Sequence, residues 1–458
     1  MSELALARSA GTWSGDSVVP DDLHAQFDLL AAAGGGENLR ASAPGALLRP
    51  APHEIWFSST DAAAPSLHAH SAGLATLARL MALSDSANLS MSGWFDDLRS
   101  RIATTFGAAG TRVLLAPSIA SARDLARAVA FAVHGERVNE ISAGGAESHD
   151  LGETSDVAIR LADGRAREAR EINHEALQAA RKLGAPLLVH VLDHSRTGLA
   201  GLTRAGADAI ASARPALTLI DATAMRTSPD CLRWDLEAGR LVLISGSTFL
   251  GGHASSAALL VPACLAERLS HAVPADLIAE ASAHDLPPEW RDMFCAPDAA
   301  RFNIGLGLRW SAALAELDRY LNTPEPLRSA ILDLFTSKIL GQLARFEWID
   351  RIEQGKGGVA PVILGGATLA QAQDLADAMA RLSDEPGDAV FHLGAPIELG
   401  PDLVALPLSA SAPMVNDVAG RIARGVSFER AFAPIQRDIE ALFAKMERIW
   451  GQVGPSLM

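Results

Sequence analysis

The sequence predicts an α/β protein in which a largely parallel sheet is covered by helices on both faces. Short, wholly apolar runs recur through the middle of the chain, and stretches with the helical spacing of apolar residues separate them. Continuous apolar runs are typical of strands buried on both faces, and their alternation with helices indicates parallel strands. The pattern changes near residue 300, which together with the length of 458 residues predicts a second, smaller domain.

Five strands of the sheet are predicted from apolar runs that end at proline, glycine or polar residues. The expected strands are Val113–Ala116, Pro186–Leu192, Ala216–Ile220, Leu241–Ile244 and Ala257–Val261. Ligands of such sheets bind at the carboxyl ends of the strands, so the polar residues that follow the strands are candidates for a site. These residues are Ser118, Asp193–Thr197, Asp221 and Ser245–Thr248.

Helices are expected over Ser118–Val133, Asn173–Leu183 and Ala205–Ala213, and Ser118 is a candidate N-cap. Beyond residue 300 the expected elements are two long amphipathic helices, two strands and a closing helix. They cover Leu306–Leu321, Leu327–Glu347, Ala389–Leu393, Leu403–Leu408 and Phe428–Trp450. We therefore expect an N-terminal arm over 1–75 with a short helix near Asp21–Ala33, a large domain over 76–300 and a small α+β domain over 301–458.

The composition excludes several classes of protein. Hydrophobic residues make up 49% of the chain and charged residues 20%, which is normal for a globular protein with a sizeable core. The formal net charge of −15 argues against nucleic acid or a membrane surface as partner, and no apolar run is long enough to span a bilayer. The cysteines Cys231, Cys264 and Cys295 form no CxxC pair and the N-terminus has no signal-peptide pattern, so a cytoplasmic protein is expected.

Four segments, taken together and in their order along the chain, resemble fold-type I pyridoxal-phosphate (PLP) enzymes of the aspartate aminotransferase superfamily. LLAPSIASARDLARA resembles the segment that holds the cofactor phosphate, and VHVLDHSRTGLAG resembles a strand and loop of one aminotransferase-like subgroup. Residues 216–262, from ALTLID through SGSTFLGGH to AALLVP, resemble the strands that carry the ring-nitrogen aspartate and the Schiff-base lysine. FHLGAPIELGPDLVALPLSASAP resembles the small-domain segment that supplies an arginine for the substrate carboxylate.

The resemblance implies PLP-transferase fold type I, with a mostly parallel seven-stranded sheet in the large domain. It also implies a definite site chemistry. A lysine amine forms an imine with PLP, an aspartate keeps the pyridine ring protonated, and amides at a helix N-terminus hold the phosphate. An arginine fork holds the substrate carboxylate through two hydrogen bonds.

Matched position by position, the resemblance places Asp221 at the ring nitrogen and leaves Ser245 and Ser247 available for the phosphate. The lysine position holds Thr248, which has no amine and cannot form an imine. The sequence therefore predicts that no PLP is bound covalently.

Two further positions depart from the pattern that the resemblance implies. Of the Ser-Gly-Thr that holds the phosphate, Ser118 remains, but Ile119 replaces the glycine that permits close backbone approach and Ala120 lacks the hydroxyl. Pro407 stands where the substrate arginine is expected. The candidates for cofactor binding are therefore Ser118, Asp221, Ser245, Ser247 and Thr248.

Other reactive side chains leave alternatives open. None of the lysines follows a buried strand; the four are Lys182, Lys338, Lys356 and Lys445. A histidine replaces the lysine as a proton shuttle in some dehydratases that share the resembled fold, which makes His253 a candidate, followed by His149 and His194. His68 and His70 have no further ligand nearby in the sequence, so no metal is expected.

The changes at the lysine, the phosphate loop and the substrate arginine together predict the fold of a PLP enzyme without PLP chemistry of its own. The resembled enzymes build paired sites at a dimer interface, so we expect a scaffold role in a homodimer, or in a heterodimer with a lysine-containing relative. Two alternatives remain open. One is an enzyme that acts on an amino-acid-like substrate with noncovalently bound PLP or pyridoxamine phosphate (PMP), and the other is a pocket repurposed for a different anion.

Overall fold

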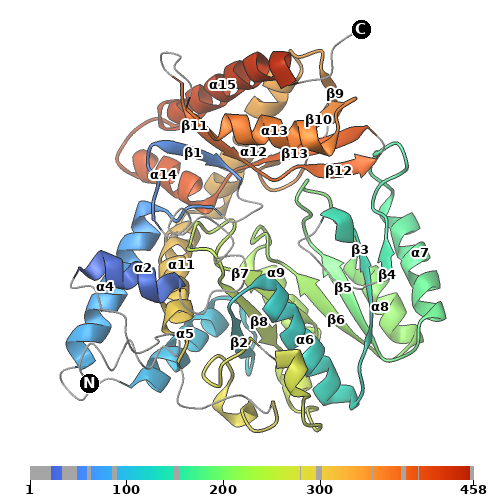
Figure 1. The fold of residues 1–458 in the computed structure, drawn as a ribbon. Helices are drawn as coiled ribbons and strands as arrows, with labels where there is room; N and C mark the ends of the chain where they lie inside the picture. The colour runs from blue at the N-terminus through green and yellow to red at the C-terminus, as the bar shows by residue number, and fades with distance from the viewer. Residues whose placement is uncertain are drawn as a thin grey trace.

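The computed structural model describes residues 22–32, 49–58, 63–84, 90–147, 155–278, 280–294, 302–352, 355–382, 388–400 and 402–453. His149 and Cys295, considered above, lie outside these residues. In Figure 1 a large sheet flanked by helices occupies the lower part of the molecule, and a smaller sheet with its own helices lies above it. Within the described ranges, no helix combines the length and the apolarity needed to cross a membrane.

The large sheet has seven strands in the order β2-β8-β7-β6-β5-β3-β4. Neighbouring strands run parallel except at β8, which is antiparallel to both β2 and β7. The strands are β2 (Arg112–Ala116), β3 (Asn139–Ala143), β4 (Ser155–Val157), β5 (Leu187–Leu192), β6 (Ala216–Asp221), β7 (Leu241–Ser245) and β8 (Ala257–Val261). The prediction of a mostly parallel seven-stranded sheet is thereby confirmed.

Helices bury both faces of this sheet, which explains why its strands are continuous apolar runs. Leu114, Leu219 and Leu259 pack with α6 (Ile119–His134) on one face. Val113 and Val242 point to the other face, which four helices cover. These helices are α5 (Met91–Phe106), α7 (Ala169–Lys182), α8 (Arg204–Ala213) and α9 (Pro229–Glu237).

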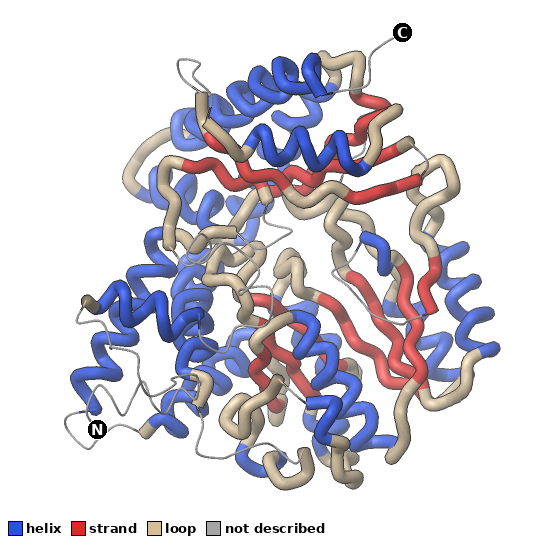
Figure 2. The backbone as a smooth tube through the Cα atoms, viewed as in Figure 1, coloured by secondary structure: helices blue, strands red, loops and turns tan. Residues whose placement is uncertain are grey.

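A four-stranded antiparallel sheet in the order β12-β13-β10-β9 forms the second layer, and Figure 2 shows its strands above the large sheet. Its strands are β9 (Ile349–Ile352), β10 (Val359–Gly365), β12 (Ile397–Gly400) and β13 (Leu403–Ser409). The helices of this part are α12 (Glu325–Leu343), α13 (Leu369–Met379), α14 (Ala412–Ala423) and α15 (Phe428–Val453). The C-terminal part is therefore α+β.

A two-stranded parallel ribbon joins the N-terminal part of the chain to the C-terminal part. β1 (Glu54–Phe57) pairs along its length with β11 (Val390–Leu393), and Ser58 forms a further bridge to Ser409. Residues 1–75 are predicted to form an N-terminal arm, and β1 within them pairs with a strand of the C-terminal half. The domain boundaries at residues 75 and 300 stay predictions.

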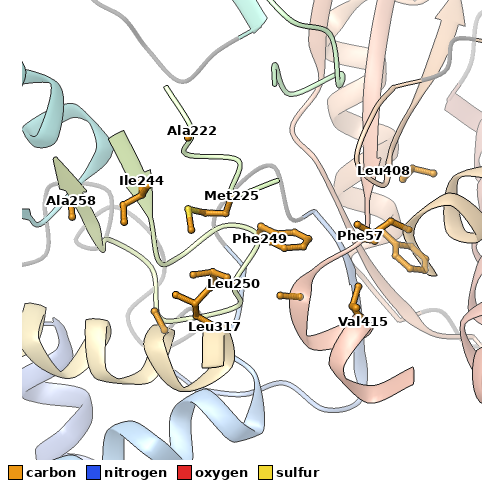
Figure 3. Packing of buried hydrophobic residues seen from close by; sticks show 14 of the residues in the cluster. Phe57, Ala222, Met225, Ile244, Phe249, Leu250, Ala258, Leu317, Leu408 and Val415 are labelled. Atoms are coloured by element: carbon orange, nitrogen blue, oxygen red, sulfur yellow. The ribbon is translucent and has the colours of Figure 1, made fainter. Parts of the chain in front are cut away.

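The long helix α11 (Ile304–Asn322) packs against α2 (Leu23–Ala32), α4 (Leu67–Ser84), α5 and α14. It is fixed to the large sheet by Trp310, whose indole N–H donates a 3.2 Å hydrogen bond to the carbonyl of Ala257. Figure 3 shows Phe249 and Leu250, from the turn after β7, lying between the sheet and Phe57 of β1. The core is therefore continuous from the large sheet to the small one through this turn.

Candidate functional site

The structure brings three of the predicted site residues to one edge of the large sheet. Asp221 ends β6, Ser245 ends β7, and Ser118 caps α6 directly after β2. Because β2, β6 and β7 run in the same direction, their carboxyl ends lie on the same side. This is the edge at which ligands of parallel α/β sheets bind.

Asp221 is a buried carboxylate whose two oxygens are both bonded within the protein. Its side chain is 2% exposed. Oδ2 accepts a 2.7 Å hydrogen bond from Nη2 of Arg123, and Oδ1 accepts bonds from the hydroxyl of Thr223 at 2.6 Å and its amide at 3.2 Å. Burial acts to raise the pKa of Asp221, but the charge of Arg123 and these hydrogen bonds outweigh burial and hold the pKa below its ordinary value.

Arg123 reaches Asp221 from the second turn of α6, and its side chain is also 2% exposed. The helix begins as the sequence predicts, because the hydroxyl of Ser118 accepts a 2.9 Å hydrogen bond from the amide of Ser121. Sequence reasoning did not find Arg123 as a site residue. The available signal was a charged residue among the alanines and leucines of a buried helix face, but its partner lies 98 residues later in the chain.

Thr248 lies in the tight turn after β7 and is 4% exposed. Its hydroxyl is hydrogen-bonded to the backbone. Its Oγ1 donates a 2.8 Å hydrogen bond to the carbonyl of Thr223. The turn closes at Gly251, which has a φ of +64° and whose Cβ, if present, would lie 2.5 Å from Pro413. Glycine is therefore required there both for the backbone conformation and for the approach of α14.

Ser245 and Ser247 are satisfied by each other and by the backbone. Their hydroxyl oxygens lie 3.1 Å apart, and the amide of Ser247 donates to Oγ of Ser245 at 3.2 Å. The hydroxyl of Ser245 also donates a 3.3 Å hydrogen bond to the carbonyl of Ser256. Both side chains are buried, and their role in holding a phosphate stays a prediction.

A carboxylate lies near the start of α6, where the resemblance placed the cofactor phosphate. Oγ of Ser118 lies 2.6 Å from Oγ of Ser121, and the hydroxyl of Ser121 donates to Glu280. Ile119 is half-buried and Ala120 is exposed beside them. A negative side chain is favourable at a helix N-terminus, and it repels a phosphate dianion at the same place.

His253 is fully buried and pairs with another histidine. Its Nε2 lies 3.3 Å from Nδ1 of His70, and its ring packs against Phe27 of α2 with 5.0 Å between ring centroids. Burial lowers the pKa of His70. The pair therefore attaches the N-terminal helices to the turn after β7. In the described part of the chain, no group of three or more His, Cys, Asp or Glu side chains is arranged to hold a metal ion.

His194 follows β5 and lies in a positively charged environment. Burial, followed by the charges of Arg226, Lys356 and Arg204, lowers the pKa of His194 to about 4. Its Nδ1 is buried and has no hydrogen-bond partner among the described residues. At neutral pH this imidazole is therefore uncharged and a weak base.

Pro407, at the expected position of the substrate arginine, is buried in β13 opposite Pro361 of β10. The Lys445 side chain is 4% exposed, forms a 3.1 Å ion pair with Asp388 and donates to two backbone carbonyls, so it does not lie on a solvated helix face. Lys356 is exposed, and Lys338 is half-buried in α12.

These residues do not fit PLP in the way that the resemblance implies. Thr248 offers no amine, and the carboxylate of Asp221 is neutralised by Arg123 within the protein. Glu280 adds a negative charge beside the helix end that would hold the phosphate.

Comparison with known proteins gives similarity in structure only. No protein-family model matches the sequence, and no curated protein matches it either. A cysteine desulfurase from Escherichia coli superposes with a TM-score of 0.56 at 14% identity, over 88% of this chain and 96% of that one. A NifS-like protein from Rickettsia africae gives a TM-score of 0.55 at 11% identity, over 87% of this chain and 100% of that one.

A third structure, the ureidoglycine-glyoxylate aminotransferase of Bacillus subtilis, gives a TM-score of 0.50 at 12% identity, over 89% of this chain and 96% of that one. Similarity at this level of identity establishes the fold and not the chemistry. The predicted fold class, PLP-transferase fold type I, is confirmed.

Proposed function

We propose that this chain, which has PLP-transferase fold type I and a threonine at the lysine position, forms no internal aldimine and acts as a scaffold or partner subunit of a PLP-dependent relative. The observation that carries the proposal is the buried ion pair between Arg123 and Asp221. In the enzymes that the sequence resembles, this aspartate pairs with a cation on the cofactor ring. Here the protein supplies the cation itself.

The energetics of the ion pair support this proposal. A pyridinium that replaced Arg123 on Asp221 would leave the guanidinium buried without its counter-charge, which costs several kcal/mol. The lysine that would compensate through a covalent bond is missing. In the proposed cofactor site, Arg123 therefore neutralises the charge of Asp221, and Thr248 cannot form an imine.

The preserved parts of the chain support a partner role. The resemblance implies that the loop over Asp193–Gly198 and the turn over Ser245–His253 lie near a dimer interface. We propose a dimer, with itself or with a lysine-containing relative, in the cytoplasm. Noncovalent PLP or PMP binding by an active enzyme is the competing function.

The partner role predicts assembly. Light scattering after size-exclusion chromatography should give at least twice the 48.0 kDa mass of the monomer, either alone or after coexpression with a relative that has lysine at the position of Thr248. The reason is that interfaces of this fold are large and apolar, of the order of 2,000 Å² or more, so a free monomer would expose that surface. A monodisperse monomer at micromolar concentration, unchanged by the relative, would contradict the proposal.

A further inference from the structure

A cavity of about 390 Å³ lies beside the predicted cofactor site and shares Thr248 with it. Its walls come from residues 50–52, Trp56, residues 63–68, the turn after β7, and the facing ends of α11 and α14. Thr248 is the only predicted site residue among those that line it; Ser118, Asp221 and Pro407 do not. The volume is in the range of pockets that bind small molecules.

Most of the wall is apolar and rigid. Four of its residues are prolines, which restrict the backbone, and they are Pro50, Pro52, Pro65 and Pro413. Trp56 adds an aromatic surface, and its ring is held in place by stacking on His392, with the ring centroids 3.7 Å apart and the planes 12° from parallel. The cavity is therefore largely preformed for an apolar group.

Arg319 supplies a charged donor in this apolar wall. Its Nη1 is shared between the two carboxylate oxygens of Glu316 at 3.3 Å each, and its Nη2 lies 3.6 Å from the carboxylate of Asp417. Within the described ranges, its Nε and Nη2 groups donate no hydrogen bond. A guanidinium has five N–H groups, so most of its donor capacity is unused.

Glu316 holds Arg319 in position from the buried side. Its carboxylate is fully buried and also accepts hydrogen bonds from the hydroxyl of Ser66 and, at 2.7 Å, from the side-chain amide of Asn416. These bonds leave Glu316 little capacity to accept a ligand. Asp417, with its side chain 68% exposed, is solvated and remains displaceable.

The N-terminus of α14 does not provide a second anion site in this cavity. The amide of Ala412 donates to the carbonyl of Phe249 at 2.8 Å, and the amides of Met414 and Val415 donate to Ser411. Position 413 is a proline and has no amide hydrogen. An anionic ligand would therefore be held by Arg319.

We propose that this cavity binds a small carboxylate with an apolar body. The carboxylate accepts two hydrogen bonds from the fork of Arg319, which is the geometry that guanidinium favours, and the apolar body packs against the prolines and Trp56. The site goes beyond the proposed partner role and does not depend on it. It also differs from the substrate-arginine position of the resembled enzymes, which holds Pro407.

The test uses three probes of the same shape and different charge: 3-phenylpropionate, 3-phenylpropionamide and 3-phenylpropylamine. Isothermal titration of the full chain at low ionic strength should show saturable binding of the carboxylate. Binding of the amide should be weaker by about tenfold or more, since the charge-assisted pair is lost, and the amine should not bind.

Two variants assign the binding to Arg319. Arg319→Gln should weaken binding of the carboxylate by about tenfold or more, to the level of the amide. Arg101→Gln is the matched control, because Arg101 is exposed and does not line the cavity. It pairs at 2.9 Å with Asp318, the residue that precedes Arg319 in α11. Thermal melts of both variants check that they fold. The proposal would be overturned if the carboxylate and the amide bound equally, if the amine bound best, or if the carboxylate did not bind at millimolar concentration. It would also be overturned if Arg319→Gln left the affinity for the carboxylate unchanged.

Discussion

Replacing Arg123 with methionine is expected to lower the free energy of unfolding by about 3–5 kcal/mol, because Asp221 is left buried without its counter-charge. Urea denaturation at neutral pH measures this loss. The loss should shrink as the pH falls from about 7 toward about 4. Without Arg123, burial raises the pKa of Asp221 above its ordinary value, so the folded state takes up a proton at a higher pH than the unfolded state and gains stability in acid.

Two further variants separate the charge from the packing. Arg123→Met combined with Asp221→Asn should lose clearly less than the sum of the single losses, because neither charge is then left alone. Arg127→Met on the same helix is the matched control. The Arg127 side chain is 24% exposed, so Arg127→Met should lower the free energy of unfolding by less than Arg123→Met does. A loss below about 1 kcal/mol for Arg123→Met would show that the ion pair does not stabilise the fold in the way proposed.

A second large effect is expected on the affinity for PLP. Thr248→Lys alone is expected to restore little PLP binding, because Ile119 and Ala120 weaken the phosphate site and Arg123 occupies Asp221. Each missing charge-assisted contact is worth about 1.5–3 kcal/mol. Adding Ile119→Gly and Ala120→Thr to Thr248→Lys should bring a visible absorption band that survives dialysis, and adding Arg123→Gln should strengthen it.

If Thr248→Lys alone retained PLP through dialysis as well as the combined variants did, the phosphate loop would be competent and our interpretation of residues 118–120 would be wrong. The variant with Ile119→Gly and Ala120→Thr but with Thr248 unchanged is the control. It should bind PLP reversibly at most, because no amine is available.

Much of the fold could be predicted from the sequence, because its strands and helices are local patterns. The strand Ala257–Val261 and the cap at Ser118 occur as predicted. β4 is three residues long and too short for periodicity to show. β3 begins with the polar residues Asn139 and Glu140, so no continuous apolar run marks it in the sequence. The Glu140 carboxylate is bonded to Arg127 and to a histidine of β5.

The site was only partly predictable, and the reason is the same for each residue that was missed. The positions of Asp221 and Thr248 follow from a resemblance that is read along the chain. The partners Arg123 and Glu280 are brought in by tertiary contacts 98 and 159 residues apart. Arg319 is one charged residue on an amphipathic helix, and only the packing of α11 against α14 gives it a cavity.

The most direct test of the central claim is reduction of the purified protein with borohydride after incubation with PLP, followed by peptide mass mapping. Our account predicts no stoichiometric pyridoxyl group on any of the four lysines, because none of them replaces the amine missing at Thr248. Stoichiometric modification of a single lysine, such as Lys338 or Lys356, would contradict it and would identify this chain as a PLP enzyme with a relocated lysine.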